Sequence, residues 1–411
     1  MYNVLKAFCL TRYPLHDFMF QKLKNTYHLV RALSANIWYG FPSRKMRVIG
    51  VTGTDGKTTT THLIYHILTA CGKKTSMIST IFAVIGNERF DTGFHVTTPD
   101  AYLVSRFLKT AVDYGQEFFV LETTSHRLDQ NQLAGVQFDI SVITNITHEH
   151  LDYHKTIAEY AKTKMKLLQM SRLGIVNMDD EITRENMKEY AFDNSLKTYG
   201  LMHRADYSID FRKELPDLAD FNAYNYLAAY SVCRELGLHE KDIRSALSTF
   251  KLPAGRIDIV YKKDFMVIVD FAHTPNGITR ILESTKKQYI NGKGKLIHVF
   301  GSAGLRDHTK RFAMGRASAT IADTSYITED DPRTEDPQKI ADEIGAGFGK
   351  KKYYVELNRE KAIRIAIESA KKNDVVIITG KGHEKSLCRG KIEHPWDEIQ
   401  TVKKIVKYDI S

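Results

Sequence analysis

The stretch that decides the fold is Val48-Ile49-Gly50-Val51-Thr52-Gly53-Thr54-Asp55-Gly56-Lys57-Thr58-Thr59-Thr60. Its apolar start predicts a buried strand, and apolar residues recur at helical spacing over 59–68. A strand, a glycine-rich loop and Gly-Lys-Thr at a helix start form a phosphate cradle. Backbone N–H groups and the lysine face the anion there, and the threonine hydroxyl reaches magnesium. The strict pattern has glycine where Val51 stands, so we interpret the loop as a variant nucleotide site rather than a plain glycine turn.

The composition is that of an ordinary globular protein. Of 411 residues, 43% are hydrophobic and 26% charged, and no apolar run approaches the roughly 20 residues that span a bilayer. The four cysteines lack metal or disulfide spacing, which favours a reducing cytosol and a cytoplasmic location. The net charge is +10, but the basic residues are dispersed. We therefore expect anionic small-molecule substrates and no nucleic acid.

Strand and helix patterns alternate from residue 47 onward. Strands are predicted at 47–52, 75–80, 117–122, 138–144 and 173–177, and helices near 59–71, 100–114, 156–170 and within 222–250. After a hinge at 252–255, strands at 265–270, 295–300, 324–328 and 374–379 alternate with helices at 276–287, 337–347 and 360–372.

This rhythm predicts an α/β protein with two sheet domains. We expect a short helical segment at 1–46, a central doubly wound, mostly parallel ATP-binding domain at 47–253, and a smaller Rossmann-like domain at 254–411. Because ligands bind off the carboxyl ends of strands in open α/β sheets, both domains should direct loops into a shared cleft.

The N-terminal segment contains one predicted helix at 28–39, which Gly40-Phe41-Pro42 ends. The simplest interpretation is a helix packed on the next domain. The alternative is a peripheral membrane contact, since aromatic and basic residues gather at its end.

Two strand ends carry candidate magnesium ligands. Glu122 ends a buried apolar run, and beside a phosphate loop such an acid completes the metal shell together with the loop threonine. The segment 144–154 contains three histidines and two acids, but its spacing is not that of a zinc site. A second magnesium or an acid–base role near ATP fits better.

Loops in the last third combine charges suited to an amino acid. Arg306 and Arg333 can capture a carboxylate with paired hydrogen bonds, and Asp330 or Glu384 can hold an ammonium group. Each could also be an ordinary surface ion pair. Together they predict an amino-acid pocket.

Five motifs in unbroken order resemble the Mur ligase family. They are Thr52–Thr59, Thr144–His154, Phe221–Asn225, Asp270–Pro275 and Gly380–Glu384. Within the family the chain is most similar to the UDP-N-acetylmuramoyl-tripeptide synthetases. Because only 46 residues precede the first strand, we expect most of the family's N-terminal UDP-binding domain to be absent.

The resemblance implies an ATP-dependent, ADP-forming amide ligase of peptidoglycan precursor synthesis, with ATP and Mg²⁺ as cofactors. ATP phosphorylates a carboxylate of a muramoyl peptide, and the amino group of a diaminopimelate-like amino acid attacks the acyl phosphate. Cations are needed because carboxylate and triphosphate repel each other. A monomer is expected.

The resemblance also implies residue roles. Lys57, His150 and Lys164 would be catalytic. Thr58, Glu122, His150 and a carbamylated Lys164 would hold magnesium. ATP would contact Gly53, Thr54, Asp55, Gly56, Lys57, Thr58, Thr59, Asn225, Arg256 and Asp270. The peptide and the amino acid would contact Thr97, Thr98, Thr124, Gln130, Arg306, Asp330, Asp331, Pro332, Arg333, Gly380 and Glu384.

Other functions stay open at this point. The chain could be a ligase of the polyglutamate or cyanophycin type, or a partner subunit that binds ATP without ligating. The acceptor could be UDP-linked, lipid-linked or free.

Overall fold

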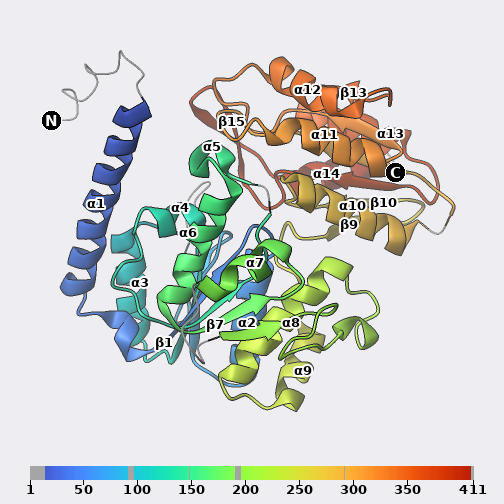
Figure 1. Cartoon of the computed structure of the whole chain (residues 1–411). Helices are drawn as coiled ribbons and strands as arrows, with labels where there is room; N and C mark the ends of the chain where they lie inside the picture. Colours follow the sequence, from blue (N-terminus) through green and yellow to red (C-terminus); the bar gives the residue numbers. More distant parts are fainter. Residues whose placement is uncertain (1–13, 91–96, 148, 190–195, 291, 409–411) are drawn as a thin grey trace.

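The computed structural model describes residues 14–90, 97–147, 149–189, 196–290 and 292–408, which form two packed α/β units (Figure 1). The first unit is built on an eight-stranded sheet of order β4-β3-β2-β5-β1-β6-β7-β8. The phosphate-loop strand β1 (Arg47–Thr52) lies at its centre, parallel to β5 (Phe118–Glu122) and β6 (Phe138–Ile143). The other strands are β2 (Thr75–Ile78), β3 (Ala83–Ile85), β4 (Glu88–Phe90), β7 (Ser171–Asn177) and β8 (Leu196–Tyr199).

Helices cover both faces of this sheet, which explains why its strands have continuous apolar runs. On β1, Ile49 and Val51 pack under the helices of one face, whereas Val48 packs under the other. The first face carries α2 (Lys57–Ala70), α8 (Asp220–Glu235) and α9 (Glu240–Thr249). The remaining helices of the unit are α3 (Ala101–Asp113), α4 (Ser125–Asp129), α5 (Leu151–His154), α6 (Ile157–Gln169) and α7 (Glu181–Asn186).

The second unit has a six-stranded sheet of order β13-β12-β11-β14-β10-β9. Its strands are β9 (Asp258–Lys262), β10 (Met266–Val269), β11 (Leu296–Phe300), β12 (Thr324–Ile327), β13 (Tyr354–Val355) and β14 (Val375–Ile378). Only the edge strand β9 is antiparallel to its neighbour. One face is covered by α10 (Pro275–Tyr289), α11 (Lys310–Ile321) and α12 (Pro337–Gly345), and the other by α13 (Arg359–Ser369) and α14 (Glu398–Tyr408).

The α/β class and the parallel order of the inner strands agree with the prediction from the sequence, but several helices and strands differ from it. The helix expected at 28–39 belongs to a longer helix, α1 (Pro14–Trp38), which packs against α3. The hairpin of β3 and β4, helices α11 and α14, and a second hairpin of β15 (Ser386–Arg389) and β16 (Ile392–Pro395) were not expected. The hairpin strands are short and α11 interleaves small and charged residues, so their periodicity is weak, whereas α14 does carry apolar residues at helical spacing (Ile399, Val402 and Ile405).

The arrangement places the carboxyl ends of the central strands of both sheets opposite each other. Loops after β1, β5 and β6 face loops after β10, β12 and β14 across one cleft. No described helix has the length and apolar composition needed to cross a bilayer.

Candidate active site

A cleft of about 500 Å³ runs between the two units. All but three of the predicted site residues line it, from the phosphate loop at one side to Arg333 and Glu384 at the other. The exceptions are Gly53, Lys164 and Pro332. Lys164 lies beneath the phosphate loop, and Pro332 is buried behind the cleft wall. Residues more than 300 positions apart in the chain thus share one cavity.

The phosphate loop adopts a conformation that requires its glycines. Gly53 and Gly56 have φ angles of 152° and 81°, and a Cβ at Gly56 would collide with the side chain of Asn225. Helix α2 begins at Lys57, so its free N–H groups face the cleft. The ammonium of Lys57 donates to the carbonyls of Gly53 (3.0 Å) and Thr54 (2.7 Å). The loop therefore has the donors and the positive charge of an anion site.

Glu122, the last residue of β5, brings its carboxylate together with threonine hydroxyls, and all of these are oxygen ligands for a hard cation. Its fully buried carboxylate accepts hydrogen bonds from the hydroxyls of Thr58 (2.9 Å) and Thr80 (2.8 Å) and from the Thr80 N–H (2.8 Å). Thr58 also accepts a weak hydrogen bond from Arg256 of the second unit (3.4 Å). A carboxylate beside a loop hydroxyl is a donor set that suits Mg²⁺. Thr80 was not predicted, because no motif marks it.

Lys164 occupies an unusual place for a lysine. It is 1% exposed, and its Nζ donates to the Gly53 carbonyl (2.6 Å) and lies 4.5 Å from the centre of the Tyr160 ring. Burial, together with the nearby positive charge of Lys57, holds the pKa of Lys164 well below its usual range. The structure thus favours an uncharged amine at this position.

His150 lies in a cluster of rings at the start of α5. Its ring centre is 4.8 Å from that of His126 and 6.2 Å from that of Tyr160. Burial, and then the neighbouring His126, hold the pKa of His150 well below its usual range. A neutral imidazole is the form that binds a metal ion.

The hinge side of the cleft contributes Arg256 and Asp270. Burial lowers the pKa of Arg256 and raises that of Asp270, while each opposes the shift of the other. Asp270 accepts hydrogen bonds from the N–H groups of Ile257 (2.9 Å) and Ala272 (2.8 Å). These bonds fix the loop that enters the cleft beside the phosphate loop.

At the far side, three carboxylates surround one lysine. Oxygen atoms of Asp330, Asp331 and Glu384 lie within 4.8 Å of one another. The buried ammonium of Lys381 contacts Asp331 (2.8 Å) and Glu384. Burial raises the pKa of Asp330 to about 6, although Lys381 opposes the shift. With a cation already in its centre, the cluster suits an ammonium ligand at its open side better than a metal ion.

Arg333 lies beside these acids in a strained loop. Asp331 and Arg333 have φ angles of 45° and 52°, and the Arg333 guanidinium donates to the Gly304 carbonyl (2.6 Å). Arg306 lines the same end of the cleft. The pocket thus places two guanidinium groups near three carboxylates, as an amino acid would need.

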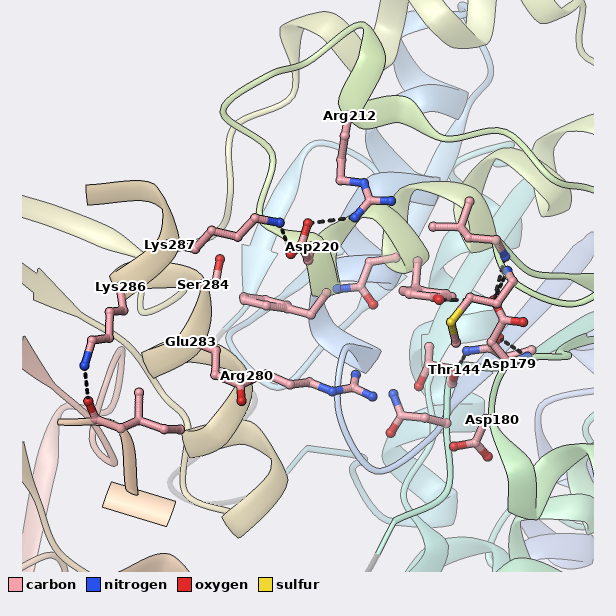
Figure 2. A pocket seen from close by; sticks show the side chains of 18 residues that line it. Thr144, Asp179, Asp180, Arg212, Asp220, Arg280, Glu283, Ser284, Lys286 and Lys287 are labelled. Carbon is pink, nitrogen blue, oxygen red and sulfur yellow. Dashed lines mark hydrogen bonds and ion pairs between the residues drawn. The ribbon is translucent and has the colours of Figure 1, made fainter. Parts of the chain in front are cut away.

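A second cavity of about 840 Å³ adjoins the cleft (Figure 2). Both cavities include Asn145, Phe221, Asn225 and Arg280 in their walls. Figure 2 shows Arg280 extending from α10 toward Thr144 and Asp180 of the first unit. The predicted ATP residue Asn225 thus lies where the two cavities meet.

One further pair crosses the cleft without a sequence signal of its own. Glu149 and Lys310 form a 2.9 Å ion pair between the two units, and both are largely buried. The second carboxylate oxygen of Glu149 is buried without a hydrogen-bond partner among the described residues. Lys310 was missed because α11, the helix that begins there, was not predicted.

Comparison with known families agrees with this site. Residues 51–233 match the Mur ligase middle domain, and residues 255–382 match the model described as Mur ligase, glutamate ligase domain. The UDP-N-acetylmuramoyl-L-alanyl-D-glutamate--2,6-diaminopimelate ligase of Aquifex aeolicus is 38% identical over 396 residues, which cover 92% of this chain and 80% of that protein. The chain belongs to the Mur ligase family.

Further relatives support this assignment. The Clostridium botulinum ligase of the same name is 36% identical over 92% of this Mur ligase and 81% of its own length. A solved structure with that name matches with a TM-score of 0.59 at 28% identity, covering 89% of this chain and 79% of that chain. Folylpolyglutamate synthase of Mycobacterium tuberculosis, complexed with ADP and AMPPCP, matches in fold (TM-score 0.69, 17% identity, 86% and 92% covered).

Membership in this family confirms the predicted enzyme class. The chain is an ATP-dependent, ADP-forming amide ligase that acts on small molecules and uses ATP. The cleft of this ligase contains both a loop suited to an anion and a pocket of mixed charges.

Proposed function

We propose that this Mur ligase joins a diaminopimelate-like amino acid to the terminal carboxylate of a muramoyl dipeptide in peptidoglycan precursor synthesis. The observation that carries the proposal is the single cleft that contains both the phosphate loop with Glu122 and the pocket of Asp330, Arg333 and Glu384. The relatives named above carry this activity in their names. Their similarity over nine-tenths of the chain supports the same substrates here.

In the proposed reaction, the acceptor carboxylate takes the γ-phosphoryl group of ATP and becomes an acyl phosphate, and ADP leaves. Lys57 and the N-terminus of α2 hold the phosphates and reduce the repulsion between the two anions. The incoming amine then attacks the acyl carbon, loses a proton, and expels phosphate. Because the second unit carries the amino-acid pocket, the position of this unit sets the distance of attack.

Mg²⁺ is the cofactor that the oxygen ligands support. Thr58 and Glu122 would hold one ion, and Glu122, His150 and a carbamylated Lys164 a second. The ions would neutralise phosphate charge as the bond transfers. One of these ligands is held in place by the protein, since Thr80 donates two hydrogen bonds to Glu122.

The environment of Lys164 supports its carbamylation. An uncharged amine attacks carbon dioxide, and the product loses a proton to become a carbamate. Burial lowers the pKa of Lys164, which favours the uncharged amine that this step needs. The modification places an anion beside the Lys57 ammonium, which supplies a counter-charge and a metal ligand.

Both ends of the amino acid have partners in the pocket. Arg333 and Arg306 would bind a carboxylate, and the open side of the Asp330–Glu384 cluster an ammonium group. The glycine at 380 lets the Asp330 carboxylate lie close to the backbone, because a Cβ there would collide with Asp330. An amino acid with two ammonium and two carboxylate groups matches this mixture of charges.

The acceptor would lie along Thr97, Thr98, Thr124 and Gln130. Thr98 is held from three sides: its hydroxyl donates to the Glu122 carbonyl (2.9 Å) and accepts from the Thr124 N–H (3.0 Å), and its carbonyl accepts from Arg127 (2.9 Å). Arg127 also lines the cleft. This wall therefore presents a cation and several hydroxyls to an anionic peptide.

A screen of amino acids with ATP and UDP-muramoyl dipeptide, read by mass spectrometry of the product, tests the proposal. Turnover with diaminopimelate and little with lysine or glutamate is expected. Ligation of glutamate to a polyglutamate or cyanophycin-like acceptor would contradict it. So would ATP binding without any amide product across the panel, which would indicate a non-ligating partner subunit.

We also propose that the enzyme works as a cytoplasmic monomer that touches an anionic membrane surface through α1. Leu23, Tyr27, Val30 and Ile37 follow one face of this helix at helical spacing, and all are more than half exposed. Lys24 and Arg31 flank this face, and residues 20–38 contain no acid. An apolar stripe bordered by cations is typical of interfacial helices.

The opposite face of α1 lies toward the residues proposed to bind the acceptor. Gln21 donates to the Tyr153 hydroxyl (2.9 Å), to which the predicted acceptor residue Gln130 also donates (3.4 Å). Co-sedimentation with phosphatidylglycerol vesicles, but not with neutral ones, is expected, and V30E/I37E should abolish it. Equal recovery with both vesicle types, or a dimer in light scattering that V30E/I37E dissociates, would refute this contact.

A further inference from the structure

Asp55 has its backbone fixed to the first unit. Its N–H donates to the side chain of Asn145 (2.9 Å), and its carbonyl accepts from Thr144 (2.6 Å) and from Asn145 (3.0 Å). Three hydrogen bonds to the loop after β6 thus hold this residue of the phosphate loop in place.

The side chain of Asp55 reaches across to the second unit. One carboxylate oxygen accepts from the Asn276 amide (2.8 Å), and the other accepts from the Thr274 hydroxyl (3.3 Å). Thr274 is the N-cap of α10, and its hydroxyl also accepts from the Gly277 N–H (2.9 Å). The positive end of a 15-residue helix therefore faces this carboxylate, which stabilises the contact.

Helix α10 is connected to the amino-acid pocket through its sheet. It follows β10, and β10 pairs in parallel with β14, so that Val269 lies opposite Ile378. The loop after β14 carries Gly380 and Glu384. A contact that holds the start of α10 on the phosphate loop therefore also sets the distance between the amino-acid pocket and the phosphoryl group that is transferred.

We propose that Asp55 is a positioning residue that ties the phosphate loop to α10 and so holds the second unit closed over bound ATP. The inference rests on the proposed function in one respect, that the second unit delivers the amino acid. A carboxylate next to a triphosphate would ordinarily weaken nucleotide binding. Here both of its oxygens are turned away from the cradle toward donors of α10.

Asn276 allows a clean test, because it does not line the cleft. We expect D55A and N276A each to lower kcat about tenfold or more, while the Kd of ATP changes less than about threefold, because Lys57 and the loop N–H groups remain. The double variant D55A/N276A should be no worse than D55A, since the two residues act through one contact. N276D should be worse than N276A, because it places two carboxylates together.

The exchanged pair D55N/N276D restores a donor and an acceptor and should recover much of the lost rate. Lys287→Ala is the matched control, since it removes an exposed ion pair with Asp220 (2.8 Å) between the same two units from the same helix. Its kcat should stay within about twofold of the unchanged enzyme.

Small-angle scattering with an ATP analogue provides a readout that needs neither acceptor nor amino acid. The unchanged enzyme and D55N/N276D should become more compact with nucleotide, and D55A should not. Equal compaction of D55A, additive losses in D55A/N276A, or a loss of ATP affinity as large as the loss of kcat would overturn the inference. Failure of every amino acid to support turnover would refute the proposed function but leave the scattering result decisive for Asp55.

Discussion

Arg359 and Glu398 form an ion pair from which water is excluded, since both side chains are 0% exposed. The Arg359 guanidinium also donates to the carbonyls of Glu329 (3.0 Å) and Thr379 (2.8 Å). These two residues directly precede Asp330 and Gly380. The pair therefore connects the folding of the second unit to the shape of its proposed amino-acid pocket.

Glu398→Ala should destabilise the protein strongly, because it leaves a buried guanidinium without its counter-ion. Breaking such a pair costs about 3–5 kcal/mol. For a unit of about 150 residues, each kcal/mol lowers the melting temperature by about 2–4 °C, so a decrease of roughly 6–20 °C is expected. Differential scanning calorimetry measures it. Lys385→Ala, which removes an exposed pair with Asp397, is the control and should cost less than about 1 kcal/mol.

The double variant R359M/E398M separates charge from packing. Removing both charges should recover at least half of the stability that Glu398→Ala loses. The carbonyls of Glu329 and Thr379 would still lose their donors, so the KM for the amino acid should rise while the Kd of ATP stays unchanged. A decrease below about 2 °C for Glu398→Ala, or a double variant less stable than the single one, would refute the reasoning.

Three other predictions concern the cleft itself. Lys57→Ala should lower kcat at least about a hundredfold by removing charge compensation at the phosphates, and near-normal kinetics would exclude that role. Lys164→Ala should be inactive and partly restored by a short-chain carboxylic acid, whereas an unmodified lysine by mass spectrometry together with no rescue would exclude carbamylation. Because the pKa of Asp330 is about 6, its carboxylate loses charge as the pH falls through that value. The KM for the amino acid should therefore rise below pH 6, and Asp330→Asn should remove this pH dependence.

Local sequence predicted the elements whose physics is local. The phosphate loop could be identified because Gly53 and Gly56 must take positive φ angles beside a lysine that begins a helix. Strand β5 and its terminal Glu122 were visible as an apolar run that ends in an acid. The amino-acid pocket was predicted from charged loops after strands, since parallel strands of one sheet direct these loops to one edge.

Contacts between distant segments could not be predicted in the same way. Thr80 lies after an unremarkable strand, and its hydrogen bonds to Glu122 exist only because β2 pairs with β5. Lys310 meets Glu149 because the two units face each other. The chain by itself indicated that Asp55 belongs to the phosphate loop and that this loop binds a nucleotide, because glycine conformation, strand burial and helix start are encoded by neighbours. Only the packing of the two units decided that its carboxylate turns to α10, because hydrogen-bond partners 219 and 221 residues away are brought near by tertiary structure alone.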